Sequence, residues 1–438
     1  MPHDSRPPHP SPPDSSSDSA PGPDSAARST PDTAAARGGV PLTVCWLAQG
    51  NEGYGLSRAI LTLAAAVRDR GVAVHLLTLT HGEVVDKAHD QNIAVHNLGV
   101  GTAPRFGGHA LQRFRSVRAS RRHRRHALRS LLPILQQHRP DVLHCTSPAV
   151  LPLLATAARA VGARPVWEMP NVVGNSSRLP VGRAYFQTLA ARHRVLVLAN
   201  SRYTAASLGS WPRRARVFHL GVDTARFDPD RVTPVGRADL NIPEHADVFT
   251  VCARIDASKG QLPFWDALSQ VRDPDRPAHL LALGGPTDGP VARAMRDLAD
   301  QRHAGDRLHL LGNVDRPEAY YPLTDVAVNC RVDPEPFGLS VVEAMMMGRP
   351  VLVHALGGPA ETVVDGRTGW HCPGPGVGHW AAALQRVRAD RDRWAALGRQ
   401  ARDHALQHFT ADHQARRYLG LLAEAGVTAA GDLGPAAS

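Results

Sequence analysis

The stretch EPFGLSVVEAMMMGRP, residues 335–350, has the pattern of a loop, a buried helix and a helix stop. Prolines on both sides of Glu335 keep that residue out of a helix. A helix then starts near Gly338 or Ser340, is apolar on almost every face, and ends at Gly348, because glycine favours the left-handed conformation of a helix terminus. The apolar run DVAVNC before this stretch is typical of a strand. The stretch therefore predicts one βα unit, with Glu335 just beyond the carboxyl end of its strand.

Short Val/Leu-rich runs alternate with helical patterns from Pro41 onward, which predicts an α/β fold with parallel sheets. Strands are predicted near Thr43–Ala48, Ala73–Leu79, Ile93–Leu98, Asp141–Cys145, Pro165–Met169 and Val195–Ala199 in the first half, and near Val217–Leu220, Val248–Ala253, His279–Leu283, Leu308–Leu311, Val326–Cys330, Pro350–His354 and Gly369–Cys372 in the second. Because 438 residues exceed one typical core, we expect two doubly wound domains.

Composition indicates a soluble globular protein, with 43% hydrophobic and 21% charged residues. The Pro/Ser/Asp-rich start and the final GVTAAGDLGPAAS are typical of disordered tails, and the start has neither the basic nor the apolar region of a secretory signal. No apolar stretch is long enough to span a membrane. Five cysteines without a C-x-x-C pair favour reduced thiols, so we expect a cytoplasmic protein.

Glu343 lies inside the apolar helix and needs a partner, because an unpaired charge in a buried helix is costly. The helix start offers the amide groups of Phe337, Gly338, Leu339 and Ser340, which suit an anion such as a diphosphate. Two carboxylates beside it, Glu335 and Glu343, suit the hydroxyl groups of sugars instead. Together these parts fit a sugar nucleotide, whereas either glutamate alone is also explained as a solvated loop residue or a partner of the helix dipole.

A second candidate site is VCARIDASKGQ, where Arg254 and Lys259 follow a predicted strand. Arginine grips phosphate with two parallel hydrogen bonds, and lysine acts as a point charge. Lys259 is one of only two lysines, the other being Lys87, in a chain with 50 lysines and arginines and a net charge of +10. This excess of cations favours anionic partners, and a solvated loop pair is the alternative interpretation.

A third candidate is LAQGNEGYGLSR, where a strand leads into Gly50, Gly53 and Gly55 and then a helix. The third glycine and the acidic residue of a dinucleotide-binding turn are missing, so a nicotinamide site is not expected. We predict that Gly53 and Gly55 let the backbone approach a ligand between the domains, with a tight strand-to-helix turn as the alternative.

The segment Arg113 to Arg129, RFRSVRASRRHRRHALR, carries eight arginines and two histidines. As a helix it is basic on most faces, so we predict contact with an anionic membrane surface. A solvated helix is the alternative, and nucleic acid is not expected because no aromatic residues interleave the charges. His404 and His408 have metal-site spacing but lack the glutamate of a zinc protease motif, and no metal site is expected.

The sequence resembles a large family of retaining glycosyltransferases that includes bacterial phosphatidylinositol mannosyltransferases and sucrose synthase. Its E-x7-E hallmark is matched by Glu335 and Glu343, and its donor diphosphate site by Arg254 and Lys259 in ARIDASKG. Weaker agreement runs through GYGLSRAILTLAAAVRDRG, RPDVLHCTSP, ANSRYTAASL, VFHLGVDTARFDP and LLGNVDRPEAYYPLTDVAV. The resemblance covers about residues 41 to 424.

The resemblance implies the GT-B architecture of two facing Rossmann-like domains with a cleft between them. The implied parts are a tail at 1–39, an acceptor domain at 40–212, a nucleotide-sugar domain at 213–404, a helix at 405–424 that packs back on the first domain, and a tail at 425–438. Glu343 is then expected to hold the ribose and Glu335 to contact the transferred sugar. Arg254 and Lys259 are expected to neutralise the leaving diphosphate, with no metal or other cofactor.

One departure concerns the acceptor side. Many members of the family carry a histidine after the strand that here reads RPVWEMPNVVG, where this chain has Glu168 and Asn171. His144 is a candidate substitute.

The sequence thus predicts a metal-independent, retaining hexosyltransferase that uses a nucleotide sugar and a sugar, lipid or small-molecule acceptor. We expect it in the cytoplasm or peripherally on the inner face of the membrane. Two alternatives stay open: a nucleotide-sugar epimerase on the same fold, which would act without an acceptor, and a non-catalytic basic protein that binds membrane or nucleic acid.

Overall fold

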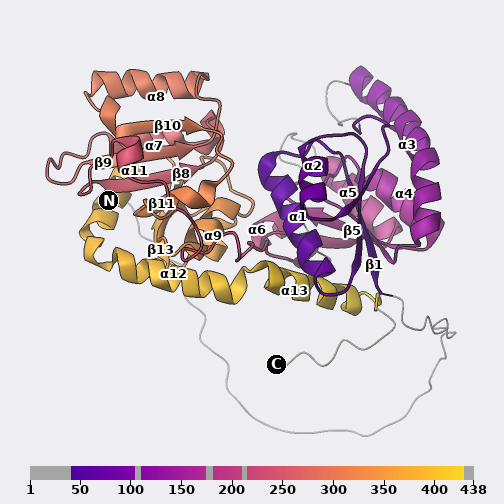
Figure 1. Ribbon diagram of the computed structural model, residues 1–438. Coiled ribbons are helices and arrows are strands. Elements are labelled where there is room, and N and C mark those ends of the chain that lie inside the picture. Colours follow the sequence, from indigo (N-terminus) through magenta and orange to yellow (C-terminus); the bar gives the residue numbers. More distant parts are fainter. Residues whose placement is uncertain (1–40, 104–109, 174–180, 210–214, 429–438) are drawn as a thin grey trace, which may run out of the picture.

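The computed structural model describes residues 41–103, 110–173, 181–209 and 215–428, so the predicted tail at 1–39 lies outside the described residues. Two parallel sheets form two domains side by side (Figure 1). The first sheet has the order β3-β2-β1-β4-β5-β6-β7, with β1 Thr43–Ala48, β2 Ala73–Thr78, β3 Ala94–Asn97, β4 Val142–Cys145, β5 Arg164–Met169, β6 Leu196–Ala199 and β7 Ala215–Val217. The second has the order β10-β9-β8-β11-β12-β13, with β8 Asp247–Cys252, β9 Ala278–Leu283, β10 Leu308–Gly312, β11 Val326–Asn329, β12 Val351–His354 and β13 Gly369–Cys372.

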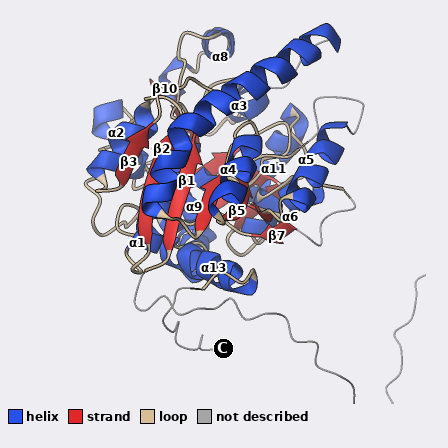
Figure 2. Cartoon of the chain, turned by 90° about the vertical axis from the view of Figure 1, so that its right-hand side faces the viewer, coloured by secondary structure: helices blue, strands red, loops and turns tan. Residues whose placement is uncertain are grey.

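Helices pack on both faces of each sheet, which confirms the predicted α/β class and two doubly wound domains. Figure 2 views the first domain from its outer side, with helices α1, α3 and α4 in front of its strands. In the first domain they are α1 Tyr54–Arg68, α2 Glu83–Asp90, α3 Ala110–His138, α4 Leu151–Val161, α5 Val181–Arg192 and α6 Arg202–Ala206. In the second they are α7 Gln261–Leu268, α8 Pro290–Gln301, α9 Leu339–Met346, α10 Pro359–Thr362, α11 Val377–Ala389 and α12 Trp394–His408. The last helix, α13 Ala411–Glu424, lies under the first domain. None of the described helices has the length and hydrophobicity needed to span a lipid bilayer.

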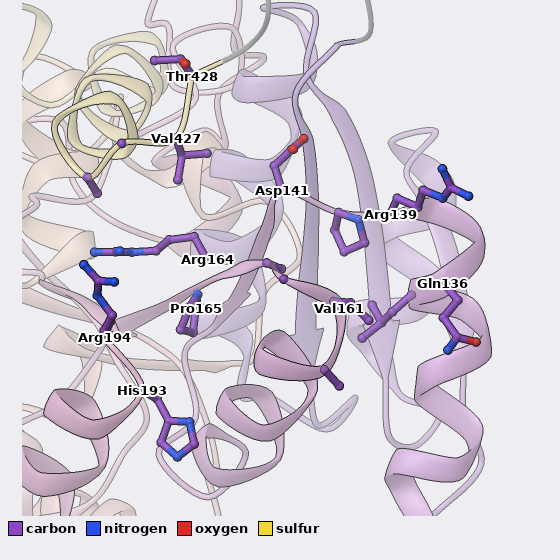
Figure 3. A pocket seen from close by; sticks show the side chains of 17 residues that line it. Gln136, Arg139, Asp141, Val161, Arg164, Pro165, His193, Arg194, Val427 and Thr428 are labelled. Atoms are coloured by element: carbon purple, nitrogen blue, oxygen red, sulfur yellow. The ribbon is translucent and has the colours of Figure 1, made fainter. Parts of the chain in front are cut away.

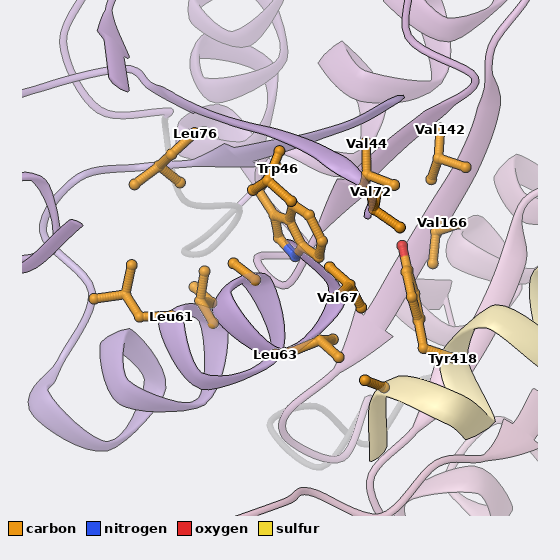
Figure 4. Packing of buried hydrophobic residues seen from close by; sticks show 14 of the residues in the cluster. Val44, Trp46, Leu61, Leu63, Val67, Val72, Leu76, Val142, Val166 and Tyr418 are labelled. Atoms are coloured by element: carbon orange, nitrogen blue, oxygen red, sulfur yellow. The ribbon is translucent and has the colours of Figure 1, made fainter. Parts of the chain in front are cut away.

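Each domain has its own core because the strands are apolar on both faces. On one face of the first sheet, Val44 and Trp46 from β1 pack against Leu61 and Val67 from α1, and Tyr418 from α13 enters the same cluster (Figure 4). The C-terminal helix therefore completes the hydrophobic core of the domain that begins the chain.

The structure corrects the prediction of a strand near Val217–Leu220. It is predicted to begin the second half, but of its residues only Val217 lies in a strand, as the last residue of β7, which pairs with β6 at the edge of the first sheet. The first sheet thus extends beyond the predicted domain limit at residue 212. The pairing of an edge strand is a long-range contact, so the local sequence pattern does not assign it to one sheet.

The chain crosses between the domains twice, and the two crossings are hydrogen-bonded to each other. The Val222 amide donates to the Phe409 carbonyl at 2.8 Å, and the Ala411 amide donates to the Val222 carbonyl at 2.9 Å. A Cβ on Gly221 would lie 2.6 Å from the Thr410 carbonyl oxygen, so a larger residue would separate the two segments. The second crossing therefore lies at 409–410, a few residues beyond the predicted limit at 404.

The predicted C-terminal tail begins too early. Ala425 and Val427 pack against the first core, and the Val427 amide donates to the Leu422 carbonyl at 2.9 Å. Residues 429–438 lie outside the described residues.

Candidate functional site

Glu335 lies after β11 at the carboxyl end of the second sheet, as predicted, and its backbone is fixed by the neighbouring loop. Its amide donates to the Leu356 carbonyl at 3.3 Å, and its carbonyl accepts the Gly358 amide at 2.7 Å. Gly357 has φ +87°, and a Cβ there would lie 2.2 Å from the Glu335 carbonyl oxygen. Only glycine allows the two loops to approach this closely.

Two cations converge on one oxygen of the Glu335 carboxylate. Lys259 Nζ and Arg331 Nη1 each lie 3.2 Å from Glu335 Oε2, and all three side chains are largely buried. A hydrogen bond to Asp333, together with the charge of Glu335, holds the pKa of Arg331 above its usual range although burial opposes this. Lys259 and Glu335, two of the predicted site residues, thus lie side by side, and Arg331, which was not predicted, joins them.

Lys259 ends a short 3₁₀ turn, Ala257–Lys259, that follows β8. The next residue, Gly260, has φ +73°, and a Cβ there would lie 1.9 Å from the Cys330 carbonyl oxygen. This close approach brings the β8 loop against the end of β11. The loop therefore holds the lysine beside Glu335, which the spacing of ARIDASKG alone does not reveal.

Arg254 lies at the start of the same loop and points into solvent. Its side chain is 77% exposed, and its Nη2 atom is 3.6 Å from Asp256 Oδ2. Arg254 thus contributes a positive charge at the carboxyl end of β8, and among the described residues it forms no ion pair with the Lys259–Glu335–Arg331 cluster.

Helix α9 begins at Leu339, four residues after Glu335, so its N-terminus lies next to this cluster in the chain. Gly338, with φ +88°, is the residue before the helix, and Phe337 is buried against Phe409. Within the described part of the chain, the amides of Phe337, Gly338, Leu339 and Ser340 donate to no backbone carbonyl. These are the unpaired donors expected at a helix start.

Glu343 has a partner that the sequence analysis did not anticipate. It is 2% exposed on α9, and its carboxylate forms an ion pair with Arg58 from α1 of the first domain. The Arg58 guanidinium also lies 5.4 Å from the centre of the Phe227 ring. Arg58 thus gives this buried charge a partner within the protein, and the predicted contact between Glu343 and a ribose stays a prediction.

A cavity of about 310 Å³ lies between the domains at this ion pair. Arg58 and Gln91 line it from the first domain, and Leu339 and Glu343 line it from the second. The start of α9 therefore opens toward a space that both domains enclose.

Gly53 and Gly55 lie at the start of α1, and neither needs to be glycine for its conformation. A Cβ on either residue would meet nothing within 4 Å. The tight turn instead requires Gly50, where φ is +102° and a Cβ would lie 2.0 Å from the Thr80 carbonyl oxygen. The open space at Gly53 and Gly55 agrees with a surface that a ligand can approach.

His144 is not placed to replace a catalytic histidine. It is fully buried in β4, where Nδ1 lies 3.0 Å from the Tyr418 hydroxyl and Nε2 lies 3.2 Å from Glu168 Oε2. Glu168 belongs to β5 and is 4% exposed. His144 thus links Tyr418 of α13 to the first sheet, with Glu168 beside it, and of these candidates only Asn171 is exposed to solvent.

Two further surfaces of the first domain carry arginines. Arg139, Arg164 and Arg194 line an open pocket of about 820 Å³ at the amino ends of β4, β5 and β6, on the side opposite to the carboxyl-end loops (Figure 3). On α3, the side chains of Arg121, Arg122, Arg125 and Arg129 are exposed; the side chains of residues 113–118 of the predicted basic segment lie outside the description.

Comparisons with known proteins agree with this architecture. The family profile for group 1 glycosyl transferases matches residues 233–404, and the profile for glycosyltransferase family 4 matches residues 54–226. A Mycobacterium tuberculosis protein named GDP-mannose-dependent alpha-(1-6)-phosphatidylinositol monomannoside mannosyltransferase is 31% identical over 287 residues, which cover 62% of this chain and 72% of the relative. A D-inositol 3-phosphate glycosyltransferase from Corynebacterium kroppenstedtii is 31% identical over 58% of this chain and 56% of its own.

Solved structures show the same fold at low sequence identity. Anabaena HepE, crystallised with UDP, has a TM-score of 0.71 and 19% identity, over 87% of this chain and 100% of that one. Sucrose-phosphate synthase from Thermosynechococcus elongatus has a TM-score of 0.68 and 19% identity, over 88% of this chain and 99% of that one.

The two Rossmann-like domains, placed side by side, have the GT-B architecture. The chain belongs to the group 1 glycosyltransferases, which confirms the resemblance seen in the sequence.

Proposed function

We propose that this glycosyltransferase moves a hexose from a nucleotide sugar to a hydroxyl acceptor with retention of the anomeric configuration. The proposal rests on one observation above all. Lys259 and Arg331 meet Glu335 just before the start of α9, where the amides of Phe337 to Ser340 donate to no described backbone carbonyl. This grouping combines positive charge for a diphosphate with a carboxylate for sugar hydroxyls.

The donor diphosphate would bind Arg254, Lys259 and the amides of Phe337 to Ser340. We add Arg331 to this set because it shares the Glu335 oxygen with Lys259. Cations that are fixed before the reaction stabilise the charge that develops on the leaving group. In this proposal they take the place of a metal ion, and no other cofactor is required.

Glu343 would bind the ribose hydroxyls of the donor. Because its carboxylate is paired with Arg58, a ribose has to compete with that guanidinium. Donor binding at Glu343 would thus weaken a contact between the domains. Glu335 would contact the transferred sugar.

The chemical step breaks the bond between the anomeric carbon and the diphosphate oxygen and forms a bond to the acceptor oxygen on the same face. The acceptor proton passes to the leaving phosphate, so charge and atoms balance without a separate base. Arg254 and Lys259 favour this step because they stabilise the negative charge on the departing diphosphate. Gly53 and Gly55 would let the first domain approach the reacting groups.

The names of the relatives guide the choice of substrates. One relative is named for GDP-mannose and phosphatidylinositol monomannoside, and another for inositol 3-phosphate. We therefore propose an acceptor that carries an inositol phosphate group. The 31% identity does not decide between the donors, so GDP-mannose and UDP-glucose should both be tested.

The test is an assay with each donor and with phosphatidylinositol or inositol phosphate as the acceptor. We expect nucleoside diphosphate release that depends on acceptor, a product with the anomeric configuration of the donor by NMR, and thermal stabilisation by one donor. Glu335→Ala should abolish most transfer, and Arg399→Ala, an exposed residue of α12, should not. If the sugar of the donor is converted to another sugar when no acceptor is present, the enzyme is an epimerase instead. If the protein binds none of the donors, the proposal is overturned.

We also propose that the exposed arginines of α3 dock the protein on an anionic membrane. Each basic residue near such a surface contributes about 1 kcal/mol. Sedimentation with phosphatidylglycerol vesicles at low salt should fall when Arg121, Arg122, Arg125 and Arg129 are all changed to Gln. No sedimentation of the unaltered chain would remove this part of the proposal.

A further inference from the structure

Three histidines far apart in the sequence come together in the first domain. His75 is on β2, His96 on the edge strand β3, and His138 is the last residue of α3. Each offers one ring nitrogen, and these atoms all lie within 4.8 Å of one another. The ring centres of His75 and His138 are 4.1 Å apart, and those of His96 and His138 are 4.9 Å apart.

The strand register explains two members of this cluster. His96 lies opposite Leu77, two residues beyond His75, so both imidazoles project from the same face of the sheet. The helix α3 covers that face through Leu131 and Leu135, which belong to the same core as Leu77. His138 follows Leu135 by three residues, so it lies on the same side of the helix and closes the cluster.

The spacing agrees with a tetrahedral metal ion. His96 Nε2 and His75 Nδ1 are 3.4 Å apart. Zinc bound to nitrogen at about 2.0–2.1 Å in a tetrahedron separates two ligand nitrogens by about 3.3–3.4 Å. The ring nitrogens of His75 and His96 are therefore already as far apart as two nitrogen ligands of one zinc ion.

The second domain provides an internal comparison. His279 on β9 and His309 on β10 have the same offset, because His309 lies opposite Leu281, two residues beyond His279. Their ring nitrogens are 3.0 Å apart, and the rings are stacked. Within the described part of the chain, no third histidine, cysteine or carboxylate completes a ligand group with this pair.

We propose that His75, His96 and His138 bind one Zn²⁺ ion, with water as the fourth ligand. Three imidazole nitrogens suit divalent zinc, and the partial exposure of all three residues leaves room for a water molecule. The ion would tie the end of α3 to the edge of the first sheet. The site is in the first domain and lies apart from the Lys259–Glu335–Arg331 cluster of the second, so zinc here is structural rather than part of sugar transfer.

The test uses the full chain without an affinity tag, freed of metal with a chelator. Calorimetric titration with ZnCl₂ should give one ion per chain, and Co²⁺ should give the visible spectrum of a tetrahedral nitrogen site. The thermal midpoint should rise with Zn²⁺. Glu or Asp ligands elsewhere would not give this cobalt spectrum.

Substitutions locate the ion. Loss of a residue that only supports a metal ligand lowers metal affinity by roughly 10–100-fold. Because His138→Gln removes a ligand itself, it should lower the affinity for Zn²⁺ by more than this. His309→Gln, from the matched pair, and His404→Gln, from the pair on α12, should leave the affinity unchanged. Circular dichroism of the metal-free variants checks that each folds. The proposal is overturned if Zn²⁺ binds His138→Gln as tightly as the unaltered chain, if His404→Gln removes binding, or if no stoichiometric binding occurs.

Discussion

The carboxyl ends of the two sheets present different chemistry, although the strand order β3-β2-β1-β4 of the first sheet repeats as β10-β9-β8-β11 in the second. After β11, Glu335 meets Lys259 and Arg331 in a group of charged side chains. After β1, Glu52 instead accepts the amide of Gly50 at 2.9 Å. In the first loop, the carboxylate thus bonds to the backbone of its own loop. In the second, the carboxylate brings two cations together near the start of a helix.

This difference shows that the shared topology places loops at a cleft but does not decide what they do. In the proposed function, the second domain binds the donor. The first domain contributes Arg58, which reaches Glu343 across the interface. If this division is correct, substitutions in the second domain should reduce turnover, and those at the interface should mainly reduce stability.

The largest effect is expected for Lys259→Ala. Removal of one fixed charge that stabilises a transition state typically lowers kcat by about 10²–10³-fold. Arg331 still lies 3.2 Å from Glu335 Oε2, so the loop should keep its fold. Steady-state kinetics with the donor found by screening measure the loss, and Arg399→Ala is the control. Turnover within threefold of the unaltered enzyme would place the diphosphate elsewhere.

Arg58→Ala should mainly reduce stability, because it leaves the charge of Glu343 buried without its partner. Breaking a fully buried pair costs about 3–5 kcal/mol, and we expect about 2 kcal/mol here because Arg58 retains some contact with water. The Arg58 side chain is 13% exposed. Urea unfolding measures the loss, with Arg68→Ala on the same helix as the control.

A double-mutant cycle tests the same ion pair. Glu343→Gln in the Arg58→Ala background should recover part of the lost stability, because the unpaired charge is gone. Additive losses would contradict a direct interaction between these two side chains.

Local pattern predicted most of the second-domain site. Glu335 is kept out of a helix by prolines, and Lys259 lies in a short loop after an apolar strand, so both positions follow from neighbouring residues. Arg331 directly follows the strand DVAVNC in the same loop as Glu335. That position, at the carboxyl end of a predicted strand, is a usable signal for a third charged residue of the cluster.

Contacts between distant segments could not be predicted in this way. Arg58 is on a helix of the other domain, and nothing near it in the sequence indicates Glu343 as its partner. The same reason explains β7, whose sheet depends on pairing with β6, and His144, whose burial depends on Tyr418 from the end of the chain. The three-histidine cluster also depends on strand register and on the placement of α3.

The histidine pair of the second domain predicts a pH effect. Burial, followed by the charge of His309, lowers the pKa of His279 to about 4, with Asp306 opposing and Arg307 and Arg237 adding to the shift. A neutral His279 therefore stabilises the fold above the unfolded pKa of about 6.5, and this contribution is lost as the pH falls toward 4.

We expect a loss of about 2 kcal/mol between pH 7 and pH 4 from this residue. Urea unfolding at several pH values measures it, and the His279→Gln/His309→Gln variant should show a shallower pH dependence. An equal slope in both proteins would mean that His279 is not held neutral by the fold.

The smallest effect is expected at Glu361, a residue of α10 in the second domain that caps a helix of the first. Its carboxylate accepts the amides of Arg202 and Tyr203, each at 2.9 Å, at the start of α6. Burial opposes the charge, but hydrogen bonds from His219 and these amides outweigh burial and lower the pKa of Glu361.

Glu361→Ala should cost about 1 kcal/mol at pH 7, the usual value of a helix cap. Because the folded pKa is lowered, this contribution is present above the unfolded pKa and disappears as the pH falls through the folded value. Urea unfolding and amide exchange at Arg202 and Tyr203 measure it, with the exposed Glu244→Ala as the control. Ser201 already accepts the Thr204 amide at 3.0 Å. If Glu361→Ala changes neither stability nor exchange, Ser201 alone caps α6, and the interface is held by the Arg58 pair and the crossing segments instead.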